Sequence, residues 1–215
     1  NSRFLSGELR IGCVESSAVR FLADKFQAFR AAYPQVQFEL YSADGDDIRA
    51  GLDQDRLDLG ILLEPVESAK YESVELPFTD RWGLIVAKDA PEAKLEGIST
   101  LGLANRPLIL PRRGIVLDEI ASWVGTEREK LPVFLTQNLL TNGLLFVRRG
   151  LAAMVCVEGA FRLRPSEDVV FVPFMPERRI AHKLVRRRNR RLPEAAEMFW
   201  MRAKEMLQNG SDDPV

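Results

Sequence analysis

The sequence predicts an α/β fold built from two successive units. Strand and helix patterns alternate along the chain from its first strand onward. The third predicted strand, residues 56–65 (RLDLGILLEP), is almost wholly apolar, as in a sheet that is covered on both faces. The alternation starts again after residue 88, and no Gly/Ser-rich linker separates the two halves. We therefore expect parallel strands with right-handed crossovers and two subdomains joined directly by strands.

The first unit begins with a strand at residues 8–14, where apolar and polar side chains alternate. A helix follows, marked by apolar residues at helical spacing, Val19, Leu22, Phe26 and Phe29. The segment YPQVQFELY (33–41) restores strand alternation. The turn SADGDD (42–47) then supplies a capping aspartate before a second helix that carries Ile48 and Leu52.

The second unit repeats this alternation. Strands are predicted at 82–88, 106–111, 132–136 and 151–157, and helices at 115–125, where a glycine ends the helix, and 138–150. Strands at 168–174 and 181–188 precede a final helix from Pro193 to about Leu207, with proline in its first turn. Residues 209–215 are expected to be a disordered tail.

Composition excludes several classes of protein. The chain has 215 residues, of which 30 are Lys or Arg and 31 are Asp or Glu, so the formal net charge is -1. This balance argues that the chain does not carry the main nucleic-acid-binding surface of the protein, because such a surface usually has excess positive charge. No apolar run spans a bilayer and no secretory signal is visible. Cys13 and Cys156 are too few for a disulfide framework or a zinc site, and we expect two buried, reduced thiols in a cytoplasmic protein, with a redox role left open.

Catalysis has little support in the sequence. His182 is the only histidine and lies in a late strand, where a structural role is expected rather than that of a general base. A nucleophile elbow, a P-loop and an HExxH motif are all missing from the sequence. We therefore expect no enzymatic activity, no cofactor and no metal site.

The turn between the first strand and the first helix has better chemistry for binding. A helix N-terminus offers unpaired N–H groups and a partial positive charge, which suit an anion. Ser16 and Ser17 can either cap this helix or donate to a carboxylate, and capping is the default for either serine alone. Glu15 would repel an anion, so we expect its side chain to be turned away.

An ordered series of motifs gives a more specific expectation. GELRIG with the serine turn, AAYPQVQFEL, DRLDLGI, LPF…WGLIVAKDAP, VRRGLAAMV and LPEAAEMF resemble, in this order, the effector-binding domain of LysR-type transcriptional regulators. The resemblance runs from about Gly7 to Leu207 and implies the type 2 periplasmic-binding-protein fold, two Rossmann-like lobes with mixed sheets joined by two crossing strands. It implies lobe I at residues 7–83 and 184–208 and lobe II at 84–183, with the crossings near 83–86 and 184–187.

The same resemblance implies a function. The domain would bind a small effector, expected to be a carboxylate or other anion, in the cleft between the lobes. An N-terminal winged helix-turn-helix upstream of this chain would bind DNA, and the protein would be a homodimer or tetramer. Ala152 and Val157 replace the glycine and proline common in the family, which weakens the transfer of ligand contacts near them.

Candidate effector contacts follow from these expectations. They come from strand ends in both halves, namely Ser16, Ser17, Leu63, Glu64, Arg112, Arg113, Gly114, Thr136 and Asn138. Arg112 or Arg113 could clamp a carboxylate or phosphate, and a solvent-facing arginine pair is an equal alternative. Asn138 is expected to cap the helix that follows it.

Three alternatives stay open at the level of sequence. The chain could be an extracytoplasmic solute-binding protein of the same fold, or an enzyme built on that scaffold. The basic run VRRRNRR (185–191) could contact DNA, although a solvated strand end is the default.

Overall fold

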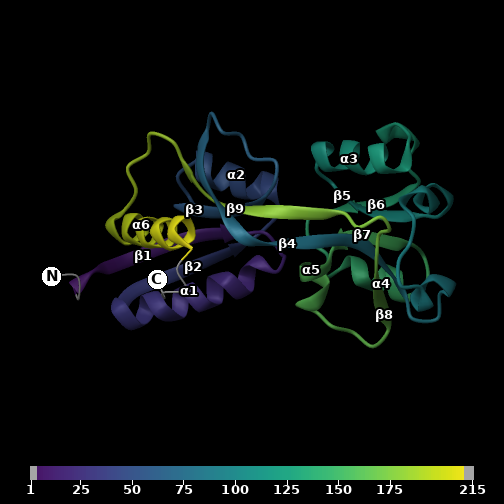
Figure 1. Cartoon of the computed structure of the whole chain (residues 1–215), viewed down its shortest axis with the longest axis horizontal. Coiled ribbons are helices and arrows are strands. Elements are labelled where there is room, and N and C mark those ends of the chain that lie inside the picture. The colour runs from purple at the N-terminus through teal and green to yellow at the C-terminus, as the bar shows by residue number, and fades with distance from the viewer. Residues whose placement is uncertain (1–3, 211–215) are drawn as a thin grey trace. The chain divides into compact units, whose positions relative to one another are not determined.

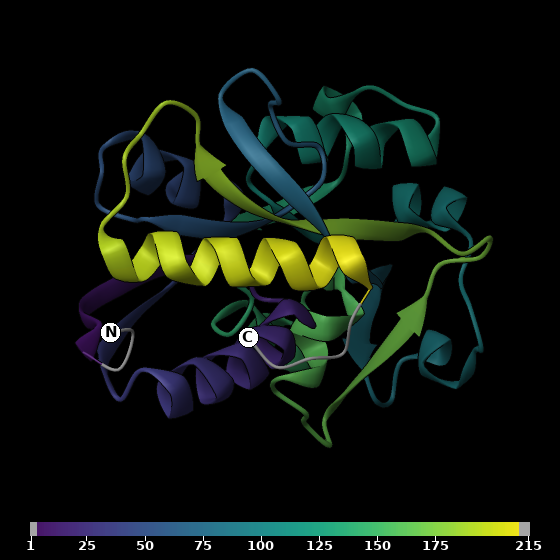
Figure 2. The ribbon, with the colours of Figure 1, turned by 60° about the vertical axis from the view of Figure 1, so that its left-hand side comes forward.

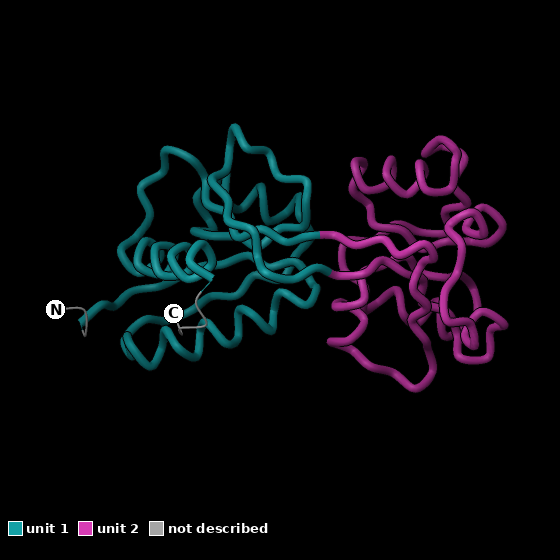
Figure 3. Tube along the Cα trace, in the orientation of Figure 1, with its two compact units in different colours: residues 1–79, 181–215 teal, residues 80–180 magenta. Residues whose placement is uncertain are grey.

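The computed structural model describes residues 4–210, and the chain divides into two compact units. Unit 1 comprises residues 1–79 and 181–215, and unit 2 comprises residues 80–180 (Figure 3). The chain passes from one unit to the other within β4 (Tyr71–Ala87) and returns within β9 (Arg179–Arg187). Each unit combines a sheet with helices, so the predicted α/β class is confirmed. Among residues 4–210, no helix is long and apolar enough to cross a membrane.

Unit 1 contains a mixed sheet in the order β2-β1-β3-β9 (Figure 1). Its remaining elements are β1 (Ser6–Cys13), α1 (Ala18–Ala32), β2 (Gln35–Ser42), α2 (Gly45–Asp53), β3 (Leu59–Leu63) and α6 (Glu194–Asn209). β1 pairs in parallel with both β2 and β3, as the alternation predicts. β9 adds to β3 in the antiparallel sense, which makes the sheet mixed.

Helices cover both faces of this sheet. α1 and α6 form one apolar cluster with β1 and β3, and α2 forms a second with residues that include Leu62 and Val185. The two helices α1 and α6 lie alongside each other (Figure 2). The ring of Phe199 in α6 lies 5.8 and 5.3 Å from those of Phe26 and Phe29 in α1. Four of the five residues of β3 are buried, which accounts for its apolar sequence.

Unit 2 contains a second mixed sheet, in the order β4-β7-β5-β6 with β8 paired to β4. Its strands after β4 are β5 (Leu108–Pro111), β6 (Val133–Gln137), β7 (Ala153–Val157) and β8 (Val169–Pro173). Its helices are α3 (Gly114–Val124), α4 (Gly143–Arg148) and α5 (Glu158–Arg162), with short 3₁₀ turns at Pro91–Lys94, Thr100–Asn105 and Arg128–Lys130. β5 is parallel to β6 and β7, whereas β4 is antiparallel to β7 and β8.

Several predicted elements differ from the structure. The helix expected at 138–150 is wrong in its first part, because α4 begins only at Gly143. Residues 138–142 (NLLTN) form bends and a turn, since Asn and Thr side chains offer the backbone alternatives to a helix. β4 begins at Tyr71, well before the strand expected at 82–88, and α5 was not predicted. Helix α6 extends to Asn209, and the rest of the expected tail beyond Gly210 lies outside the described residues.

Candidate functional site

The turn between β1 and α1 separates the roles of its two serines. Ser16 is fully buried, and its Oγ accepts a hydrogen bond from the backbone N–H of Ala18 at 3.1 Å. The same Oγ lies 2.8 Å from Nε2 of His182, which is also fully buried. Ser17 stands at the N-cap position of α1 and is only partly buried. Ser16 therefore pairs with one N–H group at the start of the helix, and Ser17 is the serine that keeps some exposed surface.

The end of β3 and the start of β9 meet beside this turn in unit 1. Leu63 pairs with His182 in the β3–β9 ladder, and the backbone N–H of Glu64 donates to the carbonyl of Ala181 at 3.1 Å. The ammonium of Lys183 lies 3.6 Å from a carboxylate oxygen of Glu64, and both side chains keep partial exposure. Sequence reasoning left Lys183 out, because only the antiparallel addition of β9 brings it to the carboxyl end of β3.

Glu15, in the same turn, is partly buried. One of its carboxylate oxygens is buried within the turn region. Burial raises the pKa of the Cys13 thiol to about 12, and the nearby charge of Glu15 adds to this rise. A negative charge therefore lies near the β1–α1 turn. An anion bound at that turn would therefore need a compensating positive group.

Unit 2 brings its own candidate residues together at the carboxyl ends of β5 and β6. The backbone N–H of Arg112 donates to the carbonyl of Gln137 at 2.9 Å, so the turn after β5 lies against the end of β6. Arg112, Thr136 and Asn138 are exposed, and Arg113 and Gly114 are partly buried. Arg113 occupies the N-cap position of α3, and its side chain makes no capping hydrogen bond.

One detail of this region differs from the expectations. Asn138 does not cap a helix, because α4 begins five residues later with Asn142 at its N-cap position. Gly114 contributes its carbonyl to Arg128, whose Nη2 donates to it at 3.0 Å. Arg128 also pairs with Asp118, and this hydrogen bond holds the pKa of the Asp118 carboxyl below its usual range. Arg128 is thus tied to α3.

A hollow of about 200 Å³ lies elsewhere in unit 2. It is lined by residues that include Val86, Arg106, Pro107, Leu151 and Ala152. Pro107 precedes the first residue of β5, and Ala152 precedes the first residue of β7. The hollow is therefore at the amino ends of these parallel strands, and none of the candidate effector contacts lines it.

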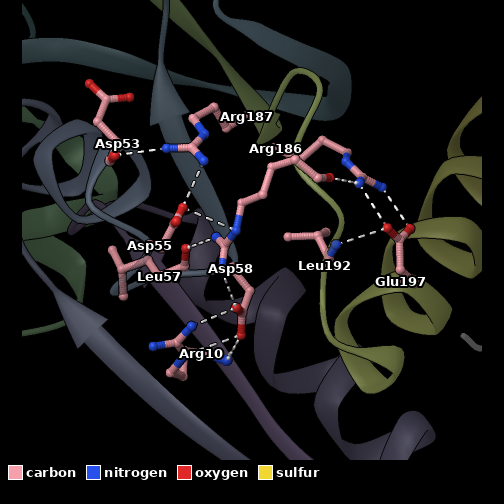
Figure 4. Close-up of polar contacts among 10 residues, drawn as sticks. Arg10, Asp53, Asp55, Leu57, Asp58, Arg186, Arg187, Leu192 and Glu197 are labelled. Atoms are coloured by element: carbon pink, nitrogen blue, oxygen red, sulfur yellow. Dashed lines mark hydrogen bonds and ion pairs between the residues drawn. The ribbon is translucent and has the colours of Figure 1, made fainter.

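The basic run 185–191 is used within unit 1 (Figure 4). Arg186 forms a bidentate pair with Glu197, at 2.7 and 2.8 Å, and Arg187 pairs with Asp55 at 2.8 Å. Arg188 donates to a backbone carbonyl, and Arg190 donates to the buried carboxylate of Asp58 at 3.2 Å. These four guanidinium groups hold the end of β9 and the following loop to unit 1.

Comparison with known proteins identifies the family to which the chain is similar. The LysR substrate binding domain model matches residues 2–208. The uncharacterized HTH-type transcriptional regulator YvbU of Bacillus subtilis is 23% identical over 164 residues, which are 76% of this chain and 55% of that protein. The chain thus spans about half the length of this curated relative.

Solved structures share the fold at low sequence identity. The effector binding domain of QuiR in complex with shikimate has a TM-score of 0.78 at 15% identity, covering 95% of this chain and 99% of that one. The CcmR regulatory domain of Synechocystis PCC6803, in complex with 2-PG, has a TM-score of 0.73 at 16% identity and covers 95% and 99%. These structures have the type 2 periplasmic-binding-protein-like fold that the motifs implied. Since the family model covers nearly the whole chain, the chain belongs to the LysR substrate-binding domain family.

Proposed function

We propose that this chain is the effector-sensing regulatory domain of a bacterial LysR-type transcriptional regulator and that it binds a small anionic metabolite. The observation that carries the proposal is the β1–α1 turn, where Ser16 caps the helix from inside and Ser17 keeps accessible surface at the helix N-terminus. The first N–H groups of a helix and its partial positive charge favour a negatively charged group.

Charged groups at the strand ends of both units bear on which chemical groups the effector can carry. Glu15 and Glu64 are carboxylates, and Lys183 is the ammonium that lies near Glu64. A carboxylate on the effector would accept hydrogen bonds from Ser17 and from the N–H groups at the N-terminus of α1. Arg112 and Arg113 supply positive charge at the corresponding turn of unit 2, and Arg113 is the proposed contact for an anionic group at that turn.

Regulation by this domain is part of the proposal. The curated relatives are HTH-type transcriptional regulators, and a DNA-binding winged helix-turn-helix would belong to the part of the protein outside this chain. The regulator would act in the cytoplasm as a homodimer or tetramer, without enzymatic activity. Effector binding would change DNA binding only by the difference in its affinity for the two states of the protein.

A thermal-shift screen tests the proposal. Small carboxylates, among them shikimate, are compared with their uncharged amides at equal concentration. A carboxylate present at about 100 times its Kd should add about 2.7 kcal/mol of apparent stability, and its amide should add much less. Equal shifts in melting temperature for acid and amide would contradict the proposal that the effector binds through its negative charge. No shift with any compound would contradict ligand sensing of this kind.

A further inference from the structure

We propose that His182 is a positioning residue for the effector: it holds the hydroxyl of Ser16 inside unit 1 and so fixes the turn that presents Ser17 and the N-terminus of α1. The inference rests on the proposed function, because it concerns the same turn. His182 does not contact the effector in this account. It acts through Ser16, which is itself fully buried.

The geometry joins three elements of unit 1 at one buried point. Ser16 follows β1, His182 lies in β9, and β3 lies between these two strands in the sheet. Nε2 of His182 is 2.8 Å from Oγ of Ser16, and its ring lies 5.0 Å from that of Phe78. The contact spans 166 positions of sequence, so the β1–α1 turn is tied to the returning strand β9.

Hydrogen-bond chemistry makes this pairing specific. A serine hydroxyl has one donor and two acceptor positions. The N–H of Ala18 uses one acceptor of Ser16, and either the hydroxyl proton or the second lone pair meets Nε2, depending on the imidazole tautomer. Both groups have no exposed surface, so water cannot replace the imidazole. Without His182, the Ser16 hydroxyl would lose this hydrogen-bond partner. The turn could then change conformation so that the hydroxyl reaches a different partner.

An apolar residue would serve better if position 182 had only to fill the core. Leu184, two residues along the same strand and equally buried, belongs to the apolar cluster of unit 1. A buried polar pair is costly unless both groups are satisfied, and it then specifies one local arrangement. At this turn, that arrangement keeps the Ser16 side chain buried and leaves Ser17 partly exposed.

The test compares His182→Leu, His182→Gln and Ser16→Ala with the control Leu184→Ala. Glutamine can place an amide group near the position of Nε2, whereas leucine and alanine cannot. Binding of shikimate and of inorganic phosphate is measured by calorimetry well below the melting temperature of each variant. His182→Leu and Ser16→Ala should each weaken binding by about 5- to 30-fold, and the double variant should be no weaker than either alone. His182→Gln should stay within about threefold of the wild type.

The control separates positioning from stability. Leu184→Ala should unfold at lower temperature because it leaves a cavity, and its affinity for both probes should not change. If His182→Leu lowers stability while leaving both affinities unchanged, His182 is a core residue only and the inference is wrong. Additive losses in the double variant would also contradict it, since the two residues would then act separately.

A second readout works without a ligand. His182 is the only histidine, so its ring nitrogens give a single set of imidazole resonances in ¹⁵N NMR. Ser16→Ala should shift these resonances, and Leu184→Ala should shift them much less. If the wild type binds neither probe, the proposed anion site fails for these probes, whereas unchanged resonances in Ser16→Ala would overturn the His182–Ser16 link itself.

Discussion

The side-chain carboxylate of Asp58 accepts three hydrogen bonds from Arg10 within unit 1. The Oδ2 atom of Asp58 accepts from the backbone N–H of Arg10 at 2.9 Å and from its Nε at 3.4 Å, and Oδ1 accepts from Nη2 at 2.9 Å (Figure 4). The Asp58 side chain has no exposed surface. Arg190 donates to the same carboxylate, so this one buried group connects β1, the approach to β3 and the loop after β9.

Replacing Asp58 by alanine should therefore destabilise unit 1 strongly. The change leaves the guanidinium groups of Arg10 and Arg190 without their buried anion, and we expect a loss of about 3–5 kcal/mol in the free energy of unfolding. Urea unfolding of the two proteins measures it. The control is Asp168→Ala, which removes an exposed partner of Lys88 and should cost about 0–1 kcal/mol. Similar losses for both variants would show that the Asp58 cluster contributes no more than a surface ion pair.

The pair formed by Glu197 and Arg186 should make stability depend on pH. Hydrogen bonds from Arg186 hold the pKa of the Glu197 carboxyl below its usual range, and the N–H of Leu192 adds to this effect. A carboxyl with a lowered folded-state pKa stabilises the protein above its unfolded value of about 4.3, and this contribution disappears as the pH falls through the folded value. The wild type should therefore exceed Glu197→Gln in stability at pH 6, and the difference should shrink by pH 3. A difference that is constant between these pH values would contradict the prediction.

The two cysteines should be unreactive in the folded protein. Burial raises the pKa of Cys13 to about 12 and raises that of Cys156 as well, so both groups are thiols at neutral pH. With Ellman's reagent at pH 8, each should react at least about 100-fold more slowly than free cysteine, and both should react fully in denaturant. One equivalent of rapid reaction in the native state would reopen a redox role for the cysteine concerned.

Substitution of the glycine that ends α3 should lower the stability of the protein because of the backbone conformation alone. Gly125 has φ of +82°, and a Cβ placed there would meet no atom within 4 Å. Gly125→Ala should cost about 1 kcal/mol of stability, since a side chain disfavours the left-handed conformation. Gly102→Ala is the matched control, because that site is equally open and its φ is not positive. Equal melting temperatures for the two variants would contradict the argument.

Local patterns predicted much of the fold. Asp44 caps α2 through its Oδ1, which accepts from the N–H of Asp47 at 3.1 Å, and Gly125 ends α3 as expected. These features depend on a few neighbouring residues, and so they are visible in the sequence. The early start of β4 at Tyr71 is not visible, because Tyr71, Val74 and Leu76 are buried against residues that are distant in the sequence.

The candidate site shows the same limit. Sequence could place Ser16 and Ser17 at a helix N-terminus, but it could not assign their roles, since the partner of Ser16 is His182 in a distant strand. Lys183 was missed for the same reason. The arginines at 185–191 looked like a basic patch, and only the fold shows that Asp58, Asp55 and Glu197 meet them.

Calorimetric titration of the tightest-binding carboxylate from the screen into wild-type protein and Ser17→Ala tests the central proposal most directly. The wild type should bind the carboxylate. Ser17→Ala should bind it about 5- to 30-fold more weakly while unfolding at about the wild-type temperature, because Ser17 is only partly buried and its side chain makes no capping hydrogen bond to α1. Equal affinities in the two proteins would contradict the proposed anion site.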